Sequence, residues 1–389
     1  MGAVGVCGVS SGATMLAPAS PPQKRSRWAA SALAAALFVG VGVGVGVGVG
    51  VGAGCGGAAP QPVSAKSGAD ACEAGDLRAC EAACDGGAAR SCLRLGAAFH
   101  LGQGGPRDPV RALALYQRAC EGGEADGCTL VGVSHLDGDG APRDPARGLA
   151  ILEQACAAGS GWGCAVAADQ LAEGRGVPEN RGRALLLAQA GCERKSAWAC
   201  GWMGRALFIG DPIARDRARA APLLEMGCGA GDLRSCTMLA HLVSEGEGAP
   251  RNPELGEALY VRACRSGFGA ACVALGMRYE HGEGVPQDPR RAAQAFERGC
   301  VFGDPRGCTE LAAYYGLGEG VRRDEAHAYR LVKDACAAGH APACAVAARC
   351  LLRGAGVARD PKAAEALARV ACAAGDEEAC ALAQEAAAR

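Results

Sequence analysis

Charged residues alternate with small and apolar residues at helical spacing, and this pattern recurs along most of the 389-residue chain. The segments DPVRALALYQRAC and DPRRAAQAFERGC, which begin at Asp108 and Asp288, both show it. A small residue occupies one fixed place in each segment, and a larger apolar residue follows three positions later in most of them, as on one face of a helix. The small residues are Ala112, Gly148, Ala184, Ala220, Gly256, Ala292, Ala328 and Ala364, and the apolar ones are Leu115, Ile151, Leu187, Leu223, Leu259, Leu331 and Leu367. We therefore expect closely packed helices.

Glycine, aspartate and asparagine mark where these helices should begin and end. A glycine that can terminate a helix in the left-handed conformation recurs at Gly102, Gly138, Gly174, Gly210, Gly246, Gly282, Gly318 and Gly354. Six residues later comes a side chain that can accept hydrogen bonds from the amides of a new helix: Asp108, Asp144, Asn180, Asp216, Asn252, Asp288, Asp324 or Asp360. Proline follows at five of these positions, where its missing N–H costs nothing. Each period therefore predicts a helix, a short turn and a second helix.

Cysteines keep the same period. Twenty of the 23 form couples that enclose seven residues, and successive full units begin 36 residues apart. The couples are Cys72 with Cys80, Cys84 with Cys92, Cys120 with Cys128, Cys156 with Cys164, Cys192 with Cys200, Cys228 with Cys236, Cys264 with Cys272, Cys300 with Cys308, Cys336 with Cys344, and Cys372 with Cys380. Such regular pairing predicts a disulfide framework that forms outside the cytoplasm, and the fixed period indicates a repeat array. The first couple stands only twelve residues ahead of the second, so we expect a shortened terminal unit.

The stretch ACRSGFGAAC suggests how each couple is joined. Cys264 should end one helix, Gly267 should turn the chain, and Cys272 should lie early in the next, antiparallel helix, within bridging distance. Closing a loop of this size stabilises the fold by about 2.5 kcal/mol in the chain-entropy model. Cys350 lacks a counterpart in other repeats, so we predict a small, buried and unpaired side chain there.

Composition argues against several functions. The net charge of -1 gives no field that would attract nucleic acid. The chain has no C-x2-C pair, and its six histidines do not recur with the cysteines, so we expect no metal and no cofactor. The motifs of serine β-lactamases, zinc peptidases and phosphate-binding loops are absent, so we name no catalytic residue and do not expect an enzyme.

The N-terminal region has the layout of an export signal. Lys24, Arg25 and Arg27 precede the uncharged apolar run Ala29 to Val51, and the following GAGC resembles the lipobox of bacterial lipoproteins, with Cys55 as the acylated residue. A retained membrane anchor and plain secretion are the alternatives. We divide the chain into a signal or anchor segment at 1–54, a flexible linker at 55–70 and a repeat array at 71–389.

The pattern AC-x2-G-x4-C-x2-LG, followed by G-x-G and D-x3-A, resembles the Sel-one-like repeat (SLR), a relative of the tetratricopeptide repeat. The paired cysteines make it similar to the secreted, cysteine-rich branch of that family. The resemblance implies an all-α fold: a right-handed α/α solenoid of disulfide-stapled helix hairpins that binds other proteins. It would comprise a truncated N-terminal unit, eight full repeats and a C-terminal capping helix, and with both ends capped we expect a monomer.

Positions that vary between repeats are our candidates for ligand contacts. Tetratricopeptide-like arrays line a concave groove with their first helices, and the varying positions on these helices carry the candidate binding residues Asp169, Gln170, Arg205, His241, Met277, Arg278, Tyr314 and Arg349. Neutral variation of a solvated face is an equally good interpretation.

Two functions of different class follow. The first is a scaffold that is tethered to the bacterial cell envelope, in the periplasm or outside the cell, and binds a protein or peptide. The alternative, implied only by the resemblance, is a β-lactam-binding protein or weak β-lactamase.

Overall fold

The computed structural model describes residues 71–72 and 75–389. In these ranges the secondary structure is entirely helical, without a strand, which confirms the predicted fold class. None of the helices found there is long and apolar enough to cross a membrane. The predictions for residues 1–54 and 55–70, including acylation of Cys55, lie outside the described residues.

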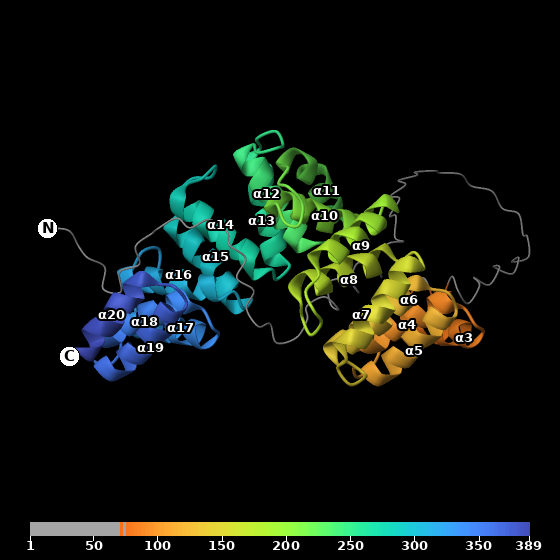
Figure 1. Ribbon diagram of the computed structural model, residues 1–389, viewed down its shortest axis with the longest axis horizontal. Coiled ribbons are helices and arrows are strands. Elements are labelled where there is room, and N and C mark those ends of the chain that lie inside the picture. The colour runs from red at the N-terminus through yellow and green to blue at the C-terminus, as the bar shows by residue number, and fades with distance from the viewer. Residues whose placement is uncertain (1–70, 73–74) are drawn as a thin grey trace, which may run out of the picture. The chain divides into compact units, whose positions relative to one another are not determined.

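The chain divides into two compact units, which are considered separately. The N-terminal unit includes residues 75–215 and 229–232, and the C-terminal unit includes residues 216–228 and 233–389. In both units the chain forms helix hairpins, each packed against the next along the sequence, as in an α/α solenoid (Figure 1).

Helices of the N-terminal unit follow the predicted period. They are α3 (Leu77–Asp85), α4 (Ala89–Leu101), α5 (Pro109–Glu121), α6 (Ala125–Asp137), α7 (Pro145–Ala157), α8 (Gly161–Glu173), α9 (Arg181–Glu193) and α10 (Ala197–Ile209). From α4 on, even numbers mark the first helix of a repeat and odd numbers the second. α3 belongs to the shortened unit that precedes the full repeats.

The C-terminal unit continues in the same register. Its helices are α11 (Arg217–Gly229, in this unit up to Cys228), α12 (Leu233–Glu245), α13 (Pro253–Arg265), α14 (Gly269–His281), α15 (Pro289–Val301), α16 (Pro305–Leu317), α17 (Glu325–Ala337), α18 (Ala341–Arg353), α19 (Pro361–Ala373) and α20 (Glu377–Ala387). The last helix packs Ala383 and Ala386 against Leu351 and Leu352 of α18.

Predicted helix boundaries are confirmed in both units. All eight aspartates and asparagines accept a backbone hydrogen bond in the first turn of the following helix. At Gly282, which ends α14, φ is +71°, a conformation that costs glycine little because it has no Cβ. Lys195 is the one residue other than glycine with positive φ in the described part of the chain.

All ten predicted disulfides are confirmed, and each lies within one helix hairpin. The bonded pairs are Cys72 and Cys80, Cys84 and Cys92, Cys120 and Cys128, Cys156 and Cys164, Cys192 and Cys200, Cys228 and Cys236, Cys264 and Cys272, Cys300 and Cys308, Cys336 and Cys344, and Cys372 and Cys380. Cys264 and Cys272 have Cα atoms 4.7 Å apart, with Gly267 in the turn between them. The geometry expected from the stretch ACRSGFGAAC is therefore present.

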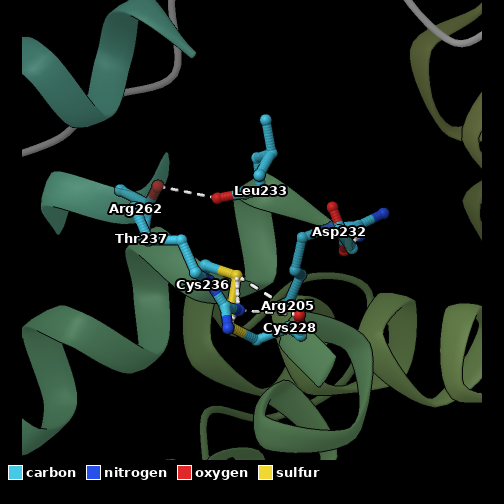
Figure 2. The surroundings of a disulfide bond; sticks show 7 residues. All are labelled: Arg205, Cys228, Asp232, Leu233, Cys236, Thr237 and Arg262. Atoms are coloured by element: carbon cyan, nitrogen blue, oxygen red, sulfur yellow. Dashed lines mark hydrogen bonds and ion pairs between the residues drawn. A yellow bond between two sulfur atoms is a disulfide. The ribbon is translucent and has the colours of Figure 1, made fainter. Parts of the chain in front are cut away.

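An arginine contacts one of these bridges. Arg262 directs its guanidinium at both sulfurs of the bridge between Cys228 and Cys236 (Figure 2). The same guanidinium donates to the Cys228 carbonyl near the end of α11, over 2.8 Å. This side chain therefore links two successive hairpins of the C-terminal unit.

Small side chains let the helices approach closely, and the core consists of several clusters in series. A Cβ on Gly276 would lie 2.5 Å from the ring of Phe296, so no larger residue fits at this crossing. Cys350 is buried, as predicted, with 1% of its surface exposed. The prediction that it is unpaired was wrong, because its sulfur is disulfide-bonded. Comparison of repeat positions tests only whether a cysteine recurs and could not reveal this bond.

Candidate binding face

First helices of successive repeats lie against one another within each unit. In the N-terminal unit α6 contacts α8 and α8 contacts α10, while in the C-terminal unit α14 contacts α16 and α16 contacts α18. The candidate binding residues all lie on first helices, and the structure brings Asp169 and Arg205 of this set into direct contact.

In the N-terminal unit, Asp169 of α8 and Arg205 of α10 form a buried ion pair. Arg205 Nη2 lies 2.9 Å from Asp169 Oδ1, and Nη1 of the same side chain binds Asp232. Only 8% of the Arg205 side chain is exposed. Gln170, also buried, donates a hydrogen bond to the Arg175 carbonyl. These polar groups are used inside the protein, and their contact with a ligand stays a prediction.

Arg278 is fixed by contacts between repeats of the C-terminal unit. Its Nη1 lies 2.9 Å from Glu245 Oε1 of α12, and its guanidinium carbon lies 5.9 Å from the centre of the Tyr260 ring. The Arg278 side chain is buried, whereas Glu245 is 39% exposed. The buried arginine therefore holds a partly exposed carboxylate in place on the first-helix face.

Two glutamates lie near Tyr314: Glu280 of α14 and Glu310 of α16. Tyr314 of α16 is buried against Phe296, with ring centres 5.6 Å apart, and is hydrogen-bonded to Glu280 of α14. Burial raises the pKa of Glu310 to about 7, and the nearby carboxylate of Glu280 contributes to this shift. Burial likewise raises the Tyr314 pKa, so this phenol stays neutral at physiological pH.

His241, Met277 and Arg349 are the candidates with accessible side-chain surface. Met277 is 39% exposed on α14. Burial lowers the pKa of His241, and the neighbouring carboxylate of Glu245 opposes this shift. Burial also lowers the pKa of Arg349, whose Nη1 lies 3.6 Å from Glu378 Oε2.

Glu245, Glu280 and Glu310 were missed by sequence reasoning. Glu310 had a detectable signal, because the equivalent positions of the two adjacent repeats carry Ala274 and Val346. A carboxylate at a repeat position that is otherwise mostly apolar is unusual, and burial is expected to raise its pKa. The candidate binding residues come from two adjacent columns of the repeat, and Glu310 lies three residues before the first of these columns.

Metal binding receives no support from this arrangement. Across residues 71–72 and 75–389, no three histidine, cysteine, aspartate or glutamate side chains come close enough to hold a metal ion. The face instead offers charged groups and one exposed thioether on a rigid helical surface.

Comparison with known proteins agrees with the geometry. The family model described as Sel1 repeat matches residues 89–124, 125–160, 165–196, 199–232, 233–268, 269–300, 305–340 and 341–376, more than half of the chain. A search of curated proteins gave no match.

Solved structures share the fold. A protective antigen of uropathogenic Escherichia coli strains that displays an SLR fold is 23% identical, with a TM-score of 0.53; the match covers 78% of this chain and 65% of the antigen. A Sel1 repeat protein from Oxalobacter formigenes is 22% identical, also with a TM-score of 0.53, and the match covers 82% of this chain and 93% of that protein.

Proposed function

The chain belongs to the Sel1 repeat family, and on this premise we propose that it is an extracytoplasmic scaffold that binds a protein partner through its first helices. Members of this family generally act as non-catalytic interaction scaffolds. The many disulfides suggest an oxidising compartment outside the cytoplasm, because reducing conditions would keep these thiols apart.

The observation that carries the proposal is the first-helix face of the C-terminal unit. Met277 is 39% exposed there, while the buried side chains of Arg278 and Tyr314 bind Glu245 and Glu280. First helices also contact one another within the unit, as α14 does with α16 and α16 with α18. A rigid surface loses little conformational entropy when a partner binds.

Photo-crosslinking in intact cells tests this face. A photoreactive amino acid at Met277 should give a discrete protein adduct, whereas the same residue at Val370 of α19, which is 54% exposed on a second helix, should not. Equal adducts from both positions would contradict a first-helix binding face. Steady hydrolysis of a chromogenic cephalosporin by the purified chain, abolished by one substitution on this face, would favour the β-lactamase alternative instead.

We also propose that the N-terminal region tethers this scaffold to the cell envelope through Cys55, which follows the sequence GAG. Replacement of Cys55 by alanine should then move the protein from the membrane fraction to the soluble extracytoplasmic fraction. A variant that fractionates like the wild type would exclude a lipid tether at this residue.

A further inference from the structure

A pocket of about 200 Å³ opens in the C-terminal unit among α13, α14 and α15. It lies mainly on second helices, unlike the face proposed above. Arg265, Arg291, Arg298 and Tyr279 supply polar groups to its lining, and no carboxylate contributes to that lining.

The pocket arises where one repeat lacks a large apolar side chain. Ala295 lines it, and the equivalent position carries leucine or isoleucine in the other seven full repeats, from Leu115 to Leu367. An alanine leaves several methyl groups of space that its neighbours fill only in part. Among the eight full repeats, only this one has alanine at that position.

The charges around this space are also reversed relative to another repeat. Arg298 is equivalent to Arg118, whose Nη1 lies 3.1 Å from Asp85 Oδ1. Arg265 occupies the place equivalent to Asp85, so a second guanidinium replaces the carboxylate. Two arginines thus line the pocket where the earlier repeat has an ion pair.

A second carboxylate is missing at Val261. Its equivalents Glu81 and Glu153 pair with Arg111 and Arg183, and both of these arginines are equivalent to Arg291. The pocket has therefore lost two internal counter-ions and one apolar side chain relative to other repeats.

Arg291 forms an ion pair with a different carboxylate, whereas Arg265 and Arg298 form none with the described residues. Its Nη2 lies 2.7 Å from Glu257 Oε1, and its guanidinium carbon lies 4.0 Å from the centre of the Tyr279 ring. The side chains of Arg265 and Arg298 are exposed and make no hydrogen bond or ion pair with any described residue. Like charges that share one pocket favour an anion from outside.

We propose that this pocket binds the side-chain carboxylate of an acidic segment of another protein. A carboxylate fits this pocket because Glu81 and Asp85 pair with the equivalent arginines, Arg111 and Arg118, near the start of the array. Guanidinium and carboxylate groups match in shape, and the pocket volume of about 200 Å³ accommodates one such side chain. This site is independent of partner binding by the first helices.

Two substitutions remove the site by restoring what other repeats contain. Arg265→Asp recreates the Arg118–Asp85 pair, and Ala295→Leu fills the space. Calorimetric titration of the purified full chain with a blocked tetraglutamate peptide should show binding that weakens at least tenfold in both variants. Their melting temperatures should equal or exceed that of the wild type, which separates loss of binding from misfolding.

Arg369→Asp is the matched control, because it makes the same charge change at a side chain on α19 that is 72% exposed. Tetraglutamine and inorganic phosphate serve as control ligands in the same titration. Binding of tetraglutamate that persists in Arg265→Asp or Ala295→Leu would overturn the proposal, as would equal binding of tetraglutamine. Binding of phosphate without binding of tetraglutamate would also overturn it, because the pocket would then take a free oxyanion.

Discussion

Arg205 lies between two carboxylates that are withdrawn from water, those of Asp169 and Asp232. Exposed fractions of 3% to 8% mean that both acids have lost most of their hydration, and the ion pairs with Arg205 compensate part of this loss. Removal of one member of a buried ion pair is strongly destabilising, because the remaining charge keeps its desolvation penalty.

Replacement of Arg205 by methionine should therefore lower the free energy of unfolding by about 3 to 5 kcal/mol. Urea denaturation followed by circular dichroism measures this loss. Arg219→Met is a suitable control, since that side chain is 73% exposed and its replacement should change stability by no more than about 0.5 kcal/mol. Similar losses in both variants would show that the buried ion pair contributes no more to stability than an exposed arginine does.

Glu310 makes stability depend on pH. Its pKa is raised from 4.5 to about 7, so the folded protein keeps a proton that the unfolded chain releases. The folded state binds more protons between these two values, and its stability therefore falls as the pH rises from about 4.5 to about 7.

Glu310→Gln should remove this dependence. At about pH 8 we expect the variant to be more stable than the wild type by about 1 to 2 kcal/mol, allowing for the partial exposure of the carboxyl group, and near pH 4 the two should agree. Denaturation curves at both pH values test this. Glu297→Gln, at an exposed position of the same unit, should show no such difference; a pH-independent gain at Glu310 would contradict a raised pKa.

Sequence alone located Asp169 and Arg205 but did not predict their burial. Asp169 and Arg205 stand in the column of greatest variety, and variety is equally compatible with a solvated face and with compensating pairs. Burial depends on which side chain of the neighbouring repeat comes within reach, as Asp232 does for Arg205. A column-by-column comparison of repeats does not contain that information.

Helix hairpins, by contrast, follow almost completely from the sequence. Capping groups such as Asp288 and Gly282 act within one turn of the chain, so local chemistry decides where helices begin and end. The cysteine couples are equally local, because each bridge spans a separation of eight residues. The pocket beside Ala295 was not predicted. Seven full repeats carry leucine or isoleucine at this position, and the sequence analysis did not consider what the smaller alanine would leave unfilled in the eighth.

Each bridge should contribute separately to the stability of its hairpin. Replacing Cys264 and Cys272 together by alanine should lower the free energy of unfolding by about 2.5 kcal/mol, because the unfolded chain regains the entropy of an open loop. Chemical denaturation measures the loss, and Ser266→Ala, an exposed change in the same turn, is the control. A double variant as stable as the wild type would indicate that the bridge does not restrict the unfolded chain.

At the scale of the molecule, α20 covers an apolar surface of the repeat that precedes it. Ala383 and Ala386 of α20 are buried against α18 and α19, and removal of this helix would expose Leu351 and Leu352. An uncovered apolar face favours association with another molecule.

Deletion of Ala381–Arg389 should therefore lower the melting temperature or produce oligomers, while the affinity of the remaining monomer for its partner stays nearly unchanged. Light scattering and thermal denaturation give the first result, and titration with the crosslinked partner gives the second. Glu385→Ala, which alters only the exposed side of α20, should leave both unaffected. Loss of binding without loss of stability would instead identify α20 as a recognition element.

The confinement of every one of the ten array bridges to its own hairpin also bears on how such an array can change in length. Any stretch of 36 residues that begins just before a couple such as Cys264 and Cys272 carries both halves of its bridge. Except in the unit that also contains Cys350, duplication or loss of the corresponding 36 codons adds or removes a complete crosslink and leaves no cysteine to pair wrongly during oxidative folding. Bridges between repeats would have made each such event produce an orphan thiol, so the local pattern keeps the number of repeats free to vary.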